Sequence, residues 1–107
     1  MLPSLTKEQR QRNLAKGVQV RRRRAEYREQ LKKGALPLEK FFALADEGDQ
    51  AAAGMRVSHL ISSLPGYGSA RASKLMEDLH IAASRKVRGL GDRQRENILS
   101  ATKGRRA

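Results

Sequence analysis

The residue types with the clearest chemistry lie in a glycine-containing turn at 65–70, which two cations follow along the chain. Gly66 and Gly68 lack a Cβ and can adopt positive φ, so the N–H groups of the turn can approach an anion closely. The same N–H groups open a helix, whose first turn and dipole favour negative charge. Arg71 and Lys74, three residues apart on that helix, can close on the same phosphate. The pattern predicts a phosphate-binding element formed by Pro65, Gly66, Tyr67, Gly68, Ser69, Ala70, Arg71 and Lys74.

A second basic cluster lies at 84–95. Its glycines, Gly89 and Gly91, let the chain bend toward a backbone or a groove. Long arginine side chains of this kind can enter the minor groove of a duplex. The alternative for this cluster is a solvated basic loop, and for the first turn a plain connector between packed helices. The cations expected to bind here are Arg85, Lys86, Arg88 and Arg93.

A run of four arginines at 21–24 lies within a long polar segment. At about 100° per residue, four successive side chains surround most of a helix, so they cannot all face one ligand surface. One subset does share a face and forms a basic stripe: Arg21, Arg24, Arg28 and Lys32. We expect this stripe to be a second contact that follows phosphates. The alternative is a solvated basic face.

The net charge of +12 and the pI of about 11.1 are distributed unevenly over the 107 residues. Residues 1–33 carry 11 Lys and Arg against 3 Asp and Glu, residues 34–64 carry 2 against 4, and residues 65–107 carry 10 against 4. Two basic blocks therefore flank a mildly acidic centre. Clustered cations attract a polyanion and gain free energy when its counterions are released, so nucleic acid is the expected partner.

The composition argues against several other function classes. The chain has no cysteine, so a disulfide framework and cysteine-based zinc sites are excluded. The two histidines, His59 and His80, have no further ligands at metal-binding spacing, and we expect neither a metal, a cofactor, a small-molecule substrate nor catalytic residues. Since no apolar run is long enough for a signal peptide or a membrane span, we expect a cytoplasmic protein with no membrane contact.

Apolar periodicity predicts an all-α fold. Residues 6–9 match a capping box, and a polar helix follows them to Lys33, with Gly34 as its stop. Four amphipathic helices should come next, beginning at Pro37, near Val57, near Ser69 and at an Asp92 N-cap. The first of the four should end at residues 48–49, and no segment alternates with the period of a strand.

The long polar segment has no single apolar stripe, which bears on how it packs. We expect its N-terminal half to project and only the end near Tyr27 and Leu31 to be anchored. Deleting residues 1–19 and replacing the arginines at 21–24 by Gln should then leave thermal stability nearly unchanged. The core should lie between about residues 31 and 100. These expectations divide the chain into a basic helical arm at 1–33 and a compact domain at 34–107.

With these motifs in view, the chain resembles the actinobacterial integration host factor family. The resemblance is carried by residues 2–10 (LPSLTKEQR), by residues 64–68 (LPGYG) with Lys74, and by residues 85–95 (RKVRGLGDRQR). It implies a long N-terminal helix followed by four or five short helices that include a helix-two-turns-helix (S13-like) module. It further implies that the cations at 85–88 line the same site as the turn at 65–70.

The resemblance also implies a function. Members of the family bind double-stranded DNA with low sequence selectivity in the nucleoid, compact it and alter its topology, so we expect contacts with the phosphate backbone and the minor groove. A role in phage integration, with a phage integrase as a partner, is a further expectation, as is a monomeric state in solution. The stripe on the first helix would then be a second DNA contact.

Two alternatives stay open at this point. An S13-like ribosomal protein resembles the chain from Gly66 to about Ile98, and it would bind ribosomal RNA instead of DNA. A comparison of affinities for a DNA duplex and an A-form RNA duplex of equal length separates these two. In the third alternative, the acidic stretch at 46–49 recruits a recombinase.

Overall fold

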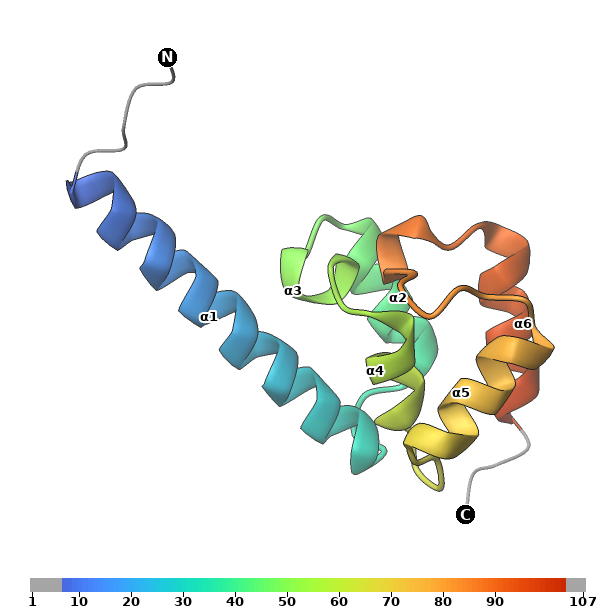
Figure 1. The fold of residues 1–107 in the computed structure, drawn as a ribbon. Coiled ribbons are helices and arrows are strands. Elements are labelled where there is room, and N and C mark those ends of the chain that lie inside the picture. Colours follow the sequence, from blue (N-terminus) through green and yellow to red (C-terminus); the bar gives the residue numbers. More distant parts are fainter. Residues whose placement is uncertain (1–6, 104–107) are drawn as a thin grey trace.

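The computed structural model of the protein describes residues 7–103, apart from the side chains at positions 12 and 13. Over this range the chain forms six α-helices, one 3₁₀ helix and no strand, which confirms the predicted all-α class. A long helix runs diagonally away from a body built from the other elements (Figure 1). The elements are α1 (Lys7–Lys32), α2 (Leu38–Asp46), α3 (Gln50–Ala53), α4 (Val57–Ser62), α5 (Ser69–Asp78), η1 (Val87–Gly89) and α6 (Asp92–Lys103).

Helix α1 gives the molecule its elongated shape. Its 26 residues rise about 39 Å at ~1.5 Å each, and the molecule measures 50 × 29 × 26 Å. The helix stops as predicted at Gly34, whose φ of 75° is in the left-handed region. Its predicted capping box begins at Thr6, which lies outside the described residues, as do residues 2–6 of the first resemblance segment.

The two halves of α1 differ in how they pack. Tyr27 and Leu31 near its C-terminal end are buried, as predicted, at 7% and 1% exposure. Leu14 and Val18, in the N-terminal half, are 68% and 44% exposed. Residues 20–31 of α1 thus share the core of the body, and packing is continuous across the proposed boundary at residue 33. The division into arm and domain stays a prediction.

Helices α2 and α3 form one corner of the body. Pro37 precedes α2 in an extended conformation, and Gly48, with φ of 98°, turns the chain after it. The short helix α3 was not predicted, because Gln50 and three alanines show no apolar periodicity. Its signal is Asp49, whose Oδ1 accepts a hydrogen bond from the Ala52 N–H at 3.1 Å and so caps the helix.

Helix α4 lies in the centre of the body and joins distant segments. The segment before it pairs with the segment before η1: the Val57 N–H donates to the Arg85 carbonyl at 2.9 Å, and the Val87 N–H donates to the Met55 carbonyl at 2.9 Å. These bonds form an isolated antiparallel bridge between Arg56 and Lys86. The bridge holds the basic cluster of residues 85–88 against the start of α4.

The N-cap of helix α6 lies one residue earlier than predicted. The Arg95 N–H donates to the Gly91 carbonyl at 3.0 Å, and the Gly91 N–H donates to Gln94 Oε1 at 3.0 Å. Gly91 is therefore the N-cap, and Asp92 is the first helical residue, which corrects the Asp92 N-cap. A glutamine at N3 supplies half of a capping box, so the cap residue itself needs no side chain.

One core joins all these elements. Its largest fully buried side chains come from α1, α2, α4, η1, α6 and the turn before α4: Phe41, Leu31, Met55, Leu60, Ile61, Ile98, Val57 and Val87. The Tyr27 ring meets the Phe41 ring edge-on, with centroids 5.7 Å apart. None of the helices described is long and apolar enough to cross a membrane.

Candidate nucleic-acid interface

The turn between α4 and α5 places the predicted phosphate-binding residues on the surface. Gly66 has φ of 81°, so this position requires the left-handed freedom that glycine has. The Tyr67 N–H donates to the Leu64 carbonyl at 3.0 Å and closes the turn. Tyr67 is half-buried against the core, while the neighbours that face solvent are Pro65, Gly66, Gly68, Ser69, Ala70 and Arg71.

Gly68 is the N-cap of α5, and its conformation corrects the expectation of positive φ. Its φ of −109° and ψ of −175° are extended values that any residue adopts. A Cβ built on Gly68 would meet no heavy atom within 4 Å. The cap has no side-chain hydrogen bond, so the first N–H groups of α5 are not satisfied by a capping side chain. Neither backbone strain nor packing requires a glycine here.

Arg71 lies over this turn, and Lys74 follows about one helical turn later in α5. Arg71 Nη1 donates to the Gly66 carbonyl at 3.3 Å, which folds the guanidinium back over the turn. Lys74 Nζ lies 4.0 Å from Asp78 Oδ1, with side chains 78% and 60% exposed. An exposed pair at this distance contributes little to stability, so the ammonium is available to an anion.

The second cluster surrounds η1. Lys86 and Arg88 are exposed on either side of Val87, which is fully buried and anchors the segment. Arg85 Nη1 donates to the Gly89 carbonyl at 3.0 Å, and a Cβ at Gly89 would come within 3.1 Å of Arg85 Cδ. Gly89 therefore leaves room for the Arg85 side chain to lie across the 3₁₀ turn.

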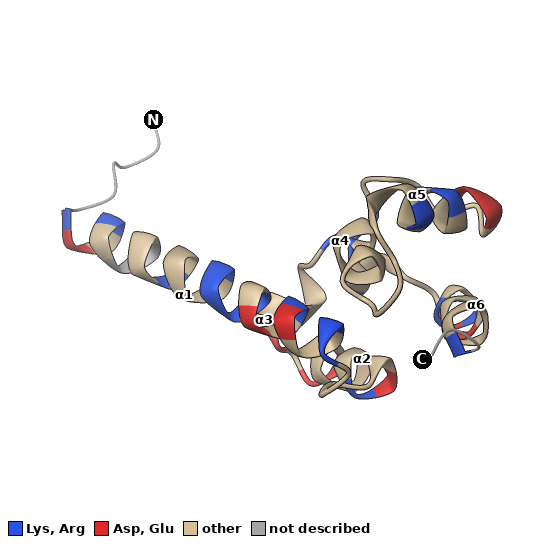
Figure 2. Cartoon of the chain, turned by 90° about the horizontal axis from the view of Figure 1, so that it is seen from below, with Lys and Arg blue, Asp and Glu red and all other residues tan. Residues whose placement is uncertain are grey.

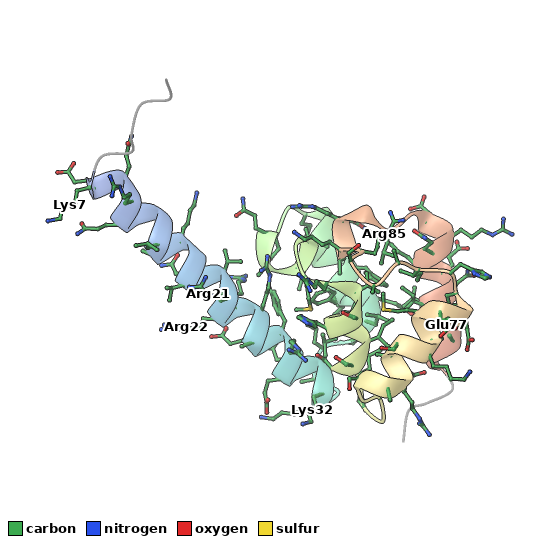
Figure 3. The ribbon with its side chains drawn as sticks, viewed as in Figure 1. Lys7, Arg21, Arg22, Lys32, Glu77 and Arg85 are labelled. Atoms are coloured by element: carbon green, nitrogen blue, oxygen red, sulfur yellow. The ribbon has the colours of Figure 1, made fainter. Side chains whose placement is uncertain are left out.

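The two clusters occupy opposite ends of α4. The turn at 65–70 follows its C-terminal end, whereas residues 85–87 pair with its N-terminal end. Figure 3 shows Arg85 on the far side of the body from the α4–α5 turn. Because α4 has six residues and rises about 9 Å, the two clusters are separated by this helix, and the single site that the resemblance implies stays a prediction. Arg93 is exposed in the first turn of α6.

The stripe predicted on α1 is divided by its contacts. Arg24 Nε donates to the Ala51 carbonyl at 3.1 Å, and Arg28 Nε donates to Ser63 Oγ at 2.7 Å. Arg21 and Lys32 are exposed, with Lys32 at the C-terminal end of α1 (Figure 3). Half of the stripe thus serves in part to dock α1 on α3 and α4, and its role as a second contact stays a prediction.

A hydrogen-bonded cluster around Asp49 completes this docking. Tyr27 Oη donates to Asp49 Oδ2, and Arg23 Nε lies 3.2 Å from the same oxygen. Burial alone would raise the pKa of Asp49, but the hydrogen bonds from Tyr27 and from the Ala52 N–H, with the Arg23 charge, lower it. Burial, then the bond to Asp49, raises the pKa of Tyr27. These contacts argue against the expectation that residues 21–24 are dispensable for stability, for Arg23 and Arg24.

The central acidic stretch is also occupied by contacts within the chain. Asp46 Oδ1 lies 2.8 Å from Arg95 Nη1, and the Arg95 guanidinium stacks over the Phe42 ring at 5.2 Å. Asp49 holds Tyr27 and Arg23, as described above. Both aspartates thus have partners in the fold, and recruitment of a recombinase through residues 46–49 stays a prediction.

Sequence reasoning did not single out Arg56 as a candidate site residue, nor its neighbourhood with His59 and the predicted Arg28. Arg56 precedes α4, His59 lies in its first turns, and Arg28 reaches its C-terminal end from α1 through Ser63. Desolvation, then the charges of Arg28 and Arg56, lower the pKa of His59. The spacing of Arg56 and His59 in sequence is visible, but the contribution of Arg28 depends on how α1 packs.

The surface as a whole is dominated by cations. Lys and Arg are distributed along α1 and on α5 and α6, while Asp and Glu recur on α2 and at the end of α5 (Figure 2). Within residues 7–103, no group of three or more His, Cys, Asp and Glu could hold a metal ion. The described surface thus presents two basic contact points and a basic helix.

Comparisons with known proteins agree on the family. Residues 31–101 match the model of the S13-like H2TH domain. The chain is 44% identical over 98 residues to proteins named integration host factor from Mycolicibacterium smegmatis and Mycobacterium tuberculosis, covering 92% of each chain. It is 45% identical over 93 residues to that of Streptomyces coelicolor, covering 87% of this chain and 86% of the relative.

A solved structure is similar as well. It is described as sIHF bound to an 8-bp palindromic DNA, and it superposes with a TM-score of 0.77 at 39% identity. The match covers 81% of this chain and 97% of that one. The helical region after α1, its glycine-containing turn and these matches over most of the chain lead to one assignment: the protein belongs to the actinobacterial integration host factor family and contains an S13-like H2TH domain.

Proposed function

We propose that this protein is a nucleoid-associated protein that binds double-stranded DNA with low sequence specificity and compacts it. It holds the phosphate backbone at the α4–α5 turn, and the cations of residues 85–88 reach the same duplex at the minor groove. Nothing in this arrangement requires a chemical step, so the protein acts by binding. Its place in the cell is then the nucleoid of the cytoplasm.

One observation carries this proposal: the N-cap of α5. No side chain caps the first N–H groups of the helix at Gly68, Arg71 folds over the same turn, and Lys74 follows one helical turn later with an exposed side chain. A phosphate placed there receives backbone hydrogen bonds, the positive end of the helix dipole and two cations together. These groups recognise phosphate and not base edges, which supports low sequence specificity.

The relatives support the choice of DNA. They are named integration host factor, and a similar solved chain is described in complex with an 8-bp palindromic DNA.

The exposed cations of α1, Arg21 and Lys32, provide a second, weaker contact in this proposal. Simultaneous use of two surfaces on one chain would let a monomer bridge or compact long DNA. A part in phage integration would require an integrase as well, and no described surface indicates where it would dock.

The salt dependence of binding tests the proposal. Displacement of about five counterions by Arg71, Lys74, Arg85, Lys86 and Arg88 predicts a slope of log K against log salt of about −4 to −5. Fluorescence anisotropy with a random duplex from about 50 to about 200 mM salt measures it. Each of Arg71→Gln and Lys74→Gln should reduce the slope by about 1, and Lys40→Gln on α2 is the matched control. A slope shallower than about −2 contradicts the proposal.

An S13-like RNA-binding function is the second candidate, because the matched domain model carries that description. The same anisotropy measurement with an A-form RNA duplex of equal length separates the two functions. A DNA-binding protein that uses groove width should bind the RNA duplex more weakly, since the deep, narrow major groove and shallow minor groove of RNA change the phosphate spacing. Tighter binding of RNA would replace the DNA proposal.

A further inference from the structure

We propose that Arg56 and Lys86 act as a pair that binds a DNA phosphate, so that Arg56 is a further DNA-binding residue of the basic cluster at 85–88. The inference rests on the proposed DNA-binding function and deepens it, because it adds a residue from a distant segment to one of the two contact points. The positions of these residues along the chain do not indicate that they act together.

The backbone holds the two side chains on one face. Arg56 and Lys86 lie opposite each other in the isolated antiparallel bridge. The bonds of this bridge are donated by the flanking N–H groups of Val57 and Val87, at 2.9 Å each, so Arg56 and Lys86 form a non-hydrogen-bonded pair. In such a pair the Cα atoms are about 4.5 Å apart, and the side chains are closer than at hydrogen-bonded positions. Main-chain bonds alone thus hold two cations side by side.

Burial of the neighbouring residues directs both side chains to the surface. Met55, Val57 and Val87 are fully buried in the core. Successive side chains of an extended segment point to opposite faces, and Arg56 and Lys86 are both exposed. A shift of the pairing by one residue would bury the cations and expose the core side chains, so the register of the bridge is well determined.

No anion of the fold compensates this pair of cations. In the part of the chain that the structure describes, neither side chain has a hydrogen bond or an ion pair. The segments around them, residues 50–76 and 79–91, contain no Asp or Glu. Like charges directly opposite each other in an antiparallel pair are destabilising. A bound anion relieves this repulsion, and in the proposed function that anion is a DNA phosphate.

The two side chains also suit phosphate chemically. The guanidinium of Arg56 presents a fork of N–H donors that matches two phosphate oxygens, and the ammonium of Lys86 adds a compact charge on a flexible stem. Arg85, by contrast, already donates to the Gly89 carbonyl at 3.0 Å. The pair therefore offers more unused donors to a ligand than Arg85 does.

The first test compares affinity for a random DNA duplex with the melting temperature of the free protein. Arg56→Gln should weaken binding about three- to tenfold at about 0.1 M salt, since one phosphate contact contributes about eightfold there relative to 1 M. The variant should keep or raise the melting temperature, because it removes a repulsion and leaves the main-chain bonds of the bridge intact. Lys40→Gln, at an exposed position of α2, is the matched control and should stay within about twofold of the parent affinity.

Reversal of the charge tests whether the two residues act as a pair. Arg56→Glu places a carboxylate opposite Lys86, and opposite charges at such positions are stabilising. This variant should melt at a higher temperature than the parent and bind DNA more weakly than Arg56→Gln, because the carboxylate occupies Lys86 and repels phosphate. Lys86→Gln should weaken the parent about three- to tenfold, but it should cost the Arg56→Glu variant less than about twofold.

The possible outcomes separate the inference from the proposed function. An affinity unchanged by Arg56→Gln, or an equal cost of Lys86→Gln in both backgrounds, overturns the inference even if the parent has a steep salt slope. A lower melting temperature of Arg56→Gln would make this side chain part of the fold and overturn it as well; circular dichroism checks that each variant is folded. Absence of duplex binding by the parent, or a salt slope shallower than about −2, instead overturns the proposed function itself.

Discussion

Two basic regions of this protein use the same residue types for different purposes. In α1, Arg23 forms an ion pair with Asp49, Arg24 donates to the Ala51 carbonyl and Arg28 donates to Ser63 Oγ, and these contacts hold α1 on the body. The cations at the α4–α5 turn make only an exposed ion pair and one weak backbone contact. A count of charges does not distinguish the two regions. They differ in their partners: the arginines of α1 bind polar groups of the protein itself, whereas the cations of the turn are left to bind a ligand.

The largest expected effect concerns the stability that α1 gives to the body. Leu31→Ala should destabilise the protein by about 2–5 kcal/mol, because a side chain 1% exposed leaves a cavity in the shared core. Leu14→Ala, at a position 68% exposed, should change stability by less than about 0.5 kcal/mol. Urea denaturation of both variants measures this. Equal stabilities would mean that α1 is not part of the core.

Asp49→Ala should have the next largest effect. The variant loses a helix cap and the partner of Tyr27, so we expect about 1–3 kcal/mol of destabilisation, with DNA affinity retained. The contacts lower the pKa of Asp49 in the folded protein, so its contribution is complete above about pH 4 and is lost as the pH falls through the folded-state pKa. Parent and variant should therefore converge in stability in acid.

Thermal or urea unfolding at a series of pH values follows this convergence. Glu47→Gln, at an exposed acidic position two residues earlier, is the control and should show a small, pH-independent difference. A constant gap between parent and Asp49→Ala down to about pH 3 would contradict the role given to the carboxylate.

The two glycines of the α4–α5 turn differ in their roles, since only Gly66 has a backbone conformation that requires glycine. Gly66→Val should cost about 1–2 kcal/mol of stability because valine disfavours the φ of 81°. Gly68→Val should leave the melting temperature unchanged, since its φ of −109° suits valine and the space around it is open. It should nevertheless weaken DNA binding about tenfold by blocking approach to the backbone. Unaltered affinity in a folded Gly68→Val variant would make the turn a connector only.

The smallest effect distinguishes two neighbouring arginines. Arg24→Gln should lower stability by about 1 kcal/mol, because its Nε–H bond to the Ala51 carbonyl is lost. Arg22→Gln, at an exposed position of the same helix, should stay within about 0.5 kcal/mol of the parent. If both variants behave alike in denaturation, the docking of α1 depends on its apolar contacts and not on its arginines.

Much of the architecture could be predicted from local patterns. The apolar spacing at 57–64 and 72–79 identified α4 and α5, and the left-handed glycines at 34 and 48 marked the ends of α1 and α2. Local patterns did not predict α3, because its residues show no apolar periodicity. They also misplaced the N-cap of α6, which is Gly91, because the Gln94 side chain accepts the hydrogen bond from the Gly91 N–H.

The amino-acid sequence by itself determined the all-α class, the excess of positive charge and the turn that presents backbone N–H groups, because these follow from interactions between residues close in the chain. Only the tertiary structure decided which cations are available to a ligand. Arg24 and Arg28 acquired partners 27 and 35 residues away, and Arg56 came to lie opposite Lys86. Hydrogen bonds across such separations depend on how the helices pack, and no periodicity in the chain records them.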